Sequence, residues 1–145
     1  EGVNDVFDLR VLLETRLFRD SIERLTEADF DAIDAIQSRF ETAIRERDPV
    51  QSGVLNQALH AALYARAELP KTSAVVAGLL QQSDRYTRVQ LSSDAARRRA
   101  GREHRELIDL ARHRRIAEAC AFLAAHIEAV RADLLRRLKP PKEIK

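Results

Sequence analysis

Three of the four histidines in this chain of 145 residues stand on the apolar side of an amphipathic segment. His60 follows Asn56 by four residues, so both side chains lie on one helix face, and leucines flank that face. His104 precedes two apolar residues by three and four positions, and His126 stands three positions after a leucine and four before a valine. The fourth, His113, lies in a basic turn. We therefore expect three imidazoles and one amide to point inward.

These inward side chains have two possible explanations. A single inward histidine is most often a core residue with hydrogen-bonded ring nitrogens, and an unpaired one costs roughly 1–3 kcal/mol. Three of them can instead share one cation, because three imidazoles and one side-chain oxygen are a normal set of ligands for Zn²⁺, Ni²⁺ or Mn²⁺. The pattern thus predicts a divalent transition metal ion, with hydrogen-bonded core histidines as the alternative.

The segments that carry these residues have helical periodicity, with apolar residues every three or four positions and capping residues between the segments. The first predicted helix covers about 5–24, and a capping box at 26–29 opens the second. The third runs from Pro49 to near Leu69, and the fourth is capped by Thr72 or Ser73 and runs to about Leu91. The fifth is capped within 92–94, and the sixth runs from Ile116 to just before Pro140. No segment reads convincingly as a strand. The fold class is therefore all-α, an antiparallel bundle of about six to seven helices.

Composition agrees with one helical domain. The chain is 45% hydrophobic and 33% charged with four Gly and four Pro, which is too apolar for disorder and too poor in turn residues for a β sandwich. No apolar run is long enough to cross a membrane, and the N-terminus is no signal peptide, so we expect no membrane partner. Cys120 is the single cysteine, which excludes a disulfide scaffold and favours the reducing cytoplasm.

Charge gives no independent indication of nucleic-acid binding. The chain has 25 basic and 23 acidic residues, a net charge of +2. The basic run at 97–102 is accompanied by neither a helix-turn-helix nor an aromatic platform, and Glu103 and Glu106 follow it. We interpret this run as a solvated helix face.

Five short segments, in order along the chain, match the pattern of a known family. They are Asp8-Leu9-Arg10 with Glu14, Asn56-Gln57-Ala58-Leu59-His60, Asp84-Arg85-Tyr86-Thr87-Arg88, Glu103-His104-Arg105-Glu106-Leu107-Ile108-Asp109, and Ala125-His126-Ile127. Together they resemble the ligand-binding domain of GntR-type transcriptional regulators, the FadR C-terminal (FCD) class. The step of 22 residues from His104 to His126 is also usual there.

The resemblance implies a metal site made of Asn56, His60, His104 and His126. These are the positions that periodicity turns inward. Asn56 departs from the aspartate that metal-binding members often have, and its amide oxygen is a neutral, weaker ligand.

The resemblance also implies an effector pocket for a small organic carboxylate above the metal. It aligns Arg10 with a pocket-facing arginine of the first helix, whose guanidinium can hold a carboxylate through two hydrogen bonds. The alternative for Arg10 is a surface pair with Glu14, four residues on. Arg85 and Arg88 are weaker candidates for effector binding, because either can simply be solvated.

The resemblance therefore implies that residues 1–145 form one effector-binding domain, a homodimer and not an enzyme. In this family a separate N-terminal winged helix reads DNA; it is absent from this sequence, and a chain that contains no Met fits a piece of a longer regulator. Two alternatives stay open. One is a metal-dependent hydrolase on a helical bundle, which would need a general base beside the metal. The other is a helical dimerisation module without a ligand.

Overall fold

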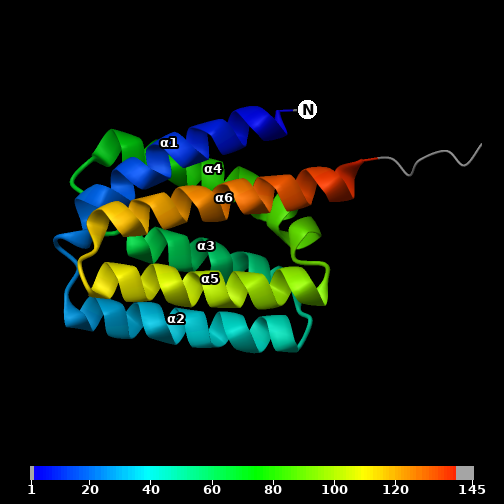
Figure 1. The fold of residues 1–145 in the computed structure, drawn as a ribbon, viewed down its shortest axis with the longest axis horizontal. Coiled ribbons are helices and arrows are strands. Elements are labelled where there is room, and N and C mark those ends of the chain that lie inside the picture. The colour runs from blue at the N-terminus through cyan, green and yellow to red at the C-terminus, as the bar shows by residue number, and fades with distance from the viewer. Residues whose placement is uncertain (1, 140–145) are drawn as a thin grey trace, which may run out of the picture.

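The computed structural model of the protein describes residues 2–139, and this part of the chain is a bundle of six helices without strands (Figure 1). The helices are α1 (Val3–Ile22), α2 (Glu27–Arg45), α3 (Pro49–Leu63), α4 (Pro70–Gln90), α5 (Asp94–Arg112) and α6 (Ile116–Leu138). The all-α class is confirmed. In the described range, none of the helices combines the length and hydropathy that a membrane span requires.

Three helices begin at the residues that the sequence predicts. The Thr26 hydroxyl accepts from the Asp29 amide while the Asp29 carboxylate accepts from the Thr26 amide, which completes the capping box of α2. Asp48 caps α3 ahead of a proline at its first position, and Ser93 caps α5. Side-chain oxygens therefore satisfy amides at the starts of these helices, where the helix itself provides no acceptor.

Two helices, α2 and α5, are followed by a left-handed residue that is not glycine. Arg47 and Arg114 take left-handed conformations, with φ of 54° and 57°. In each case the next amide bonds to the carbonyl oxygen five residues back, at 3.0 Å, which closes the helix end. The Arg114 guanidinium also donates to the carbonyl oxygens of Ile22 and Leu25, so the turn after α5 holds the end of α1. The basic turn that was predicted at His113 is confirmed, because α5 ends at Arg112 and α6 begins at Ile116.

The predicted end of the third helix is wrong by six residues, because α3 ends at Leu63 and not near Leu69. The segment that follows is held by polar groups of α1 in place of helical hydrogen bonds. The Arg66 amide donates to the Ser21 hydroxyl at 3.1 Å. The Glu68 amide donates to the Asp20 carboxylate at 2.7 Å. These contacts join residues more than forty positions apart, so no local pattern indicates them.

The fourth helix begins earlier than predicted. Pro70 is its first residue, so neither Thr72 nor Ser73 is the cap. Proline suits this position because its ring fixes φ near the helical value and it has no amide hydrogen to leave unpaired. The first helix runs from Val3 to Ile22, about two residues before the predicted bounds at each end.

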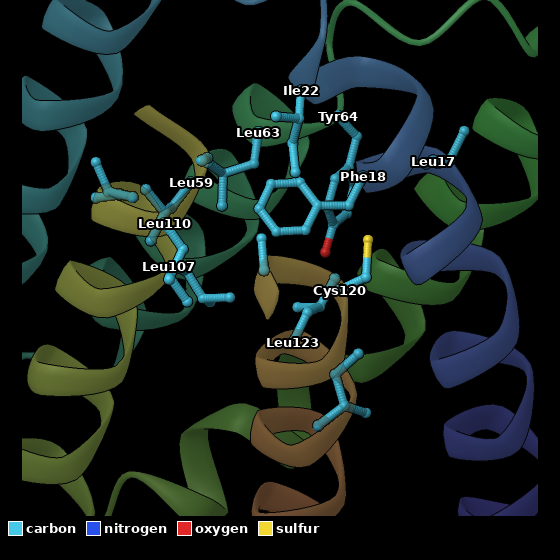
Figure 2. Packing of buried hydrophobic residues seen from close by; sticks show 14 of the residues in the cluster. Leu17, Phe18, Ile22, Leu59, Leu63, Tyr64, Leu107, Leu110, Cys120 and Leu123 are labelled. Carbon is cyan, nitrogen blue, oxygen red and sulfur yellow. The ribbon is translucent and has the colours of Figure 1, made fainter. Parts of the chain in front are cut away.

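Neighbouring helices run antiparallel: α1 packs against α6 and α4, and α2 packs against α3 and α5 (Figure 1). The main apolar core gathers side chains from all six helices, and Figure 2 shows Phe18, Leu59, Leu107 and Leu123 within it. A smaller apolar cluster surrounds Phe40 of α2. The polar residues that could do chemistry lie beside both clusters.

Candidate metal centre

The three histidines that were predicted to face inward converge inside the bundle. His60 of α3, His104 of α5 and His126 of α6 are all buried, and one ring nitrogen from each lies within 4.8 Å of the other two. The ring centroids are 5.5 Å to 5.7 Å apart. Three helices thus deliver three imidazoles to one point.

Each of these rings is held by an oxygen at Nδ1. The pairs are His60 with the Tyr64 hydroxyl at 3.2 Å, His104 with the Gln37 Oε1 at 3.0 Å, and His126 with the Glu103 Oε1 at 2.8 Å. An Nδ1 that donates its hydrogen leaves Nε2 with a free lone pair. Metal-binding histidines are held in this way, through an oxygen on the nitrogen that does not face the metal.

One ring nitrogen at the centre of the cluster has no partner. His104 Nε2 is buried without a hydrogen-bond partner, which costs roughly 1–3 kcal/mol. A cavity of about 20 Å³ lies against the three rings, enough for one ion or one water. The donor set and the unpaired nitrogen both fit a divalent transition metal ion.

The electrostatic environment keeps two of the rings neutral. Burial lowers the pKa of His60 and of His104 well below 6.5, and the charge that a neighbouring histidine would carry lowers each further. For His60, the Arg10 guanidinium acts in the same direction. Neutral imidazole is the form that binds metal, so His60 and His104 need not lose protons to bind one at neutral pH.

Asn56 lies where the fourth ligand was predicted. It stands one helical turn before His60 on α3, is half-buried, and lines the same cavity as the three histidines. An amide oxygen carries no charge, so it is a weaker metal donor than the carboxylate of an aspartate.

Arg10 lines this cavity from α1, and it also forms the pair with Glu14 that was the alternative explanation. The Arg10 Nε donates to Glu14 Oε2 at 2.6 Å, and both residues are buried, 4% and 0% exposed. The pair is therefore no surface contact. A buried ion pair depends on further hydrogen bonds to offset its desolvation, and Tyr64 supplies one by donating to Glu14 Oε1 at 2.6 Å.

The groups that hold the rings, and the Glu14 carboxylate that accepts from Tyr64, were missed as functional residues in the sequence. Glu14 precedes two buried apolar residues of its helix by three and four positions, and Gln37 precedes Phe40 by three. A polar residue at such a position is the signal that could have identified them, by the same periodicity that identified the histidines.

The other two arginines proposed for the effector are not brought to the cavity. Arg85 and Arg88 are exposed, and Arg88 donates to Asp84 on its own helix at 3.0 Å. Thr87 and Gln90 are the residues of α4 that line the cavity, on the opposite face from both arginines.

The basic run at 97–102 is only in part the solvated face that was predicted. Arg98 and Arg102 are exposed, whereas Arg97 is half-buried and donates to the Leu91 carbonyl oxygen at 2.9 Å. Arg99 is also half-buried, with its guanidinium 3.8 Å from the Asp133 carboxylate. Arg97 and Arg99 therefore contact other groups of the bundle, Arg97 at the start of α5 and Arg99 across to α6.

The fold and the site together define a helical ligand-sensing domain of a regulator and not an enzyme. The FCD domain model matches residues 5–129, so the chain belongs to the FCD domain family, whose members regulate transcription and do not catalyse reactions.

Solved structures agree with this family. One is a transcriptional regulator of the GntR family from Pseudomonas syringae pv. tomato strain DC3000, 28% identical, with a TM-score of 0.78 over 94% of this chain and 57% of that one. Another, Escherichia coli McbR/YncC, is 17% identical, with a TM-score of 0.84 over 94% of this chain and 65% of that one. This chain thus spans less than two thirds of either protein. The comparison with curated proteins found no match.

The buried histidines make the metal-free fold sensitive to acid. Unfolded histidines take up protons near pH 6.5, whereas His60 and His104 in the folded chain do so only at lower pH. The unfolded state therefore binds more protons, and the free energy of unfolding should decrease as the pH falls from 7 to 5. Urea unfolding in the presence of a chelator measures this. The dependence should shrink in His104→Gln and persist in His113→Gln, because His113 is exposed; a free energy that is constant from pH 7 to 5 would contradict the prediction.

Proposed function

We propose that this domain senses a small organic carboxylate through a bound divalent metal ion and thereby controls DNA binding by a winged-helix domain of the same regulator. The observation that carries the proposal is the convergence of three buried imidazoles, each held at Nδ1, on a cavity that Arg10 also lines. An ion of the Zn, Ni or Mn type suits these ligands.

The ligands of the proposed ion are His60, His104 and His126 with the Asn56 oxygen. Four protein ligands leave positions for an acid on an ion that accepts five or six, and a bound cation attracts carboxylate oxygens. Arg10 can hold the acid as well. Its Nε is engaged by Glu14, which leaves the two terminal nitrogens for a second carboxylate or a hydroxyl.

The size of the cavity supports a sensing role. At about 20 Å³ it accommodates an ion or a water, and an organic acid of several non-hydrogen atoms requires more room. An acid that reaches both the metal and Arg10 would therefore displace side chains or helices that line the cavity, and α1, which carries Arg10, is one of these helices. A ligand shifts a conformational equilibrium through its different affinities for the two states, and this displacement provides the difference.

A hydrolase is the less favoured function. The carboxylates nearest the histidines are already engaged, Glu103 by His126 and Glu14 by Arg10 and Tyr64. Neither is free to act as a general base beside a metal-bound water, and the family is regulatory.

Metal content tests the proposal first. Protein purified without a metal-affinity tag should bind about one divalent transition ion per chain, measured by elemental analysis and by titration with Zn²⁺. His104→Ala should abolish binding because it removes a ligand from the centre. His113→Ala is the matched control and should bind as the wild type does, because His113 is exposed just after the end of α5. Equal loss in both variants would mean that other residues hold the ion.

Asn56→Asp extends this titration to the fourth ligand. A carboxylate is a stronger ligand than an amide, so zinc affinity should rise. An unchanged affinity would mean that Asn56 does not coordinate.

Acid binding should depend on both the metal and Arg10. We expect a small hydroxy- or dicarboxylate to raise the melting temperature of the metal-loaded domain and not that of the metal-free domain. Arg10→Lys should weaken this effect about tenfold in acid concentration while zinc stays bound, because lysine keeps the charge that Glu14 requires but lacks the planar fork. A thermal-shift screen of metabolic acids measures it. Equal responses of the two forms would refute the mechanism.

We also propose that the domain is a homodimer. Several large apolar side chains are exposed, among them Leu12 of α1 and Val54 of α3, at 67% and 52%. Light scattering should therefore give about twice the chain mass of 16.5 kDa. A monomer at high concentration would contradict it.

A further inference from the structure

A continuous chain of hydrogen bonds connects Arg10 of α1 to the proposed metal ligand His60. Arg10 donates to one oxygen of Glu14, Tyr64 donates to the other, and the Tyr64 oxygen lies 3.2 Å from His60 Nδ1. All four residues are buried, and Figure 2 shows Tyr64 inside the core beside Phe18. Glu14 accepts from Arg10 at one end, and its Oε1 lies 3.6 Å from His60 Nδ1 at the other, too far for a hydrogen bond, so Tyr64 makes the connection.

His60 differs from the other two histidines in the kind of oxygen that holds it. Glu103 is a carboxylate and only accepts. Gln37 presents its amide oxygen to His104 because its amide nitrogen donates to the Gly101 carbonyl at 3.3 Å. Either partner therefore forces its ring to donate from Nδ1.

A hydroxyl does not force this choice. The Tyr64 hydroxyl can accept from His60 Nδ1, or it can donate to it, and the second arrangement moves the ring hydrogen to Nε2. A hydrogen on Nε2 would occupy the lone pair that a metal needs. The direction of the tyrosine hydrogen thus decides whether His60 can coordinate.

Glu14 determines that direction. Its carboxylate cannot donate, so the Tyr64 hydrogen points to Glu14 at 2.6 Å and the hydroxyl oxygen is left to accept from His60. Arg10 keeps the carboxylate in place from the other side. We propose that Glu14 and Tyr64 are positioning residues that fix the metal-binding tautomer of His60 and join it to the residue that holds the acid; this rests on the proposed function for its purpose.

Glu14→Gln tests the proposal sharply, because Arg10 has only donors. Arg10 will donate to the oxygen of the introduced amide, and the amide NH₂ will then face the Tyr64 oxygen and donate to it. The tyrosine hydrogen is then free to point to His60 Nδ1, and the ring hydrogen should move to Nε2. Nitrogen-15 NMR of the imidazoles in the metal-free protein reports the tautomer directly. We expect the Nδ1–H form in the wild type and the Nε2–H form in Glu14→Gln.

Zinc affinity provides the second measurement. Tyr64→Phe keeps the ring against Phe18 and removes only the hydroxyl, so zinc should bind about 10–100-fold more weakly, measured by competition with a chromophoric chelator. Tyr86→Phe is the matched control: it removes the hydroxyl of the other tyrosine in the chain, which accepts from Arg85 away from the cavity, and should leave zinc affinity unchanged. Tyr64→Phe also keeps the test available if Glu14→Gln fails to fold.

A double variant tests whether Glu14 acts on His60 through the Tyr64 hydroxyl, which we call the relay, or whether the two residues affect zinc binding independently. If Glu14 acts on the metal through the tyrosine hydroxyl, Glu14→Gln adds little to the loss already caused by Tyr64→Phe. Any one of three results would overturn the relay. They are additive losses of zinc affinity, an unchanged His60 tautomer in Glu14→Gln, and a zinc affinity in Tyr64→Phe within about twofold of the wild type. A wild type that binds no zinc would refute the proposed function instead, and the tautomer measurement would still decide the relay.

Discussion

Burying three imidazoles at one point is the constraint on which the rest of this structure depends. All three rings are buried, and a buried nitrogen without a partner, as His104 Nε2 is, is costly. The bundle satisfies one nitrogen of each ring with an oxygen from Tyr64, Gln37 or Glu103, and leaves the other nitrogens turned toward a common space. The fold thus gives up some stability at this centre, which is typical of a site built for a ligand.

This constraint links the site to the whole bundle. The rings come from α3, α5 and α6, while the groups that hold them add α2 and, through Glu14, α1. The centre is therefore connected to five helices by hydrogen bonds of 2.6 Å to 3.2 Å. Because the cavity is small and well-packed interiors resist gradual deformation, a ligand larger than the cavity would require the surrounding side chains or helices to move.

The sequence by itself determined the helical class, most helix starts and the inward direction of the histidines. Caps at Thr26, Asp48 and Ser93 are local signals, and side chains three and four apart must share a helix face. A protein only 17% identical has a similar fold, at a TM-score of 0.84, so this fold does not require most of the individual residues to be the same.

Only the tertiary structure decided which groups meet. Periodicity reports the face of one helix and not the partner opposite it, so it could not place Gln37 against His104, which is 67 residues away, or Tyr64 against Glu14, which is 50 away. It also could not show that Arg10 and Glu14 pair inside the bundle and not on its surface. The end of α3 was decided in the same way. Contacts between distant segments determine such features, and their energies have no signature in the local pattern.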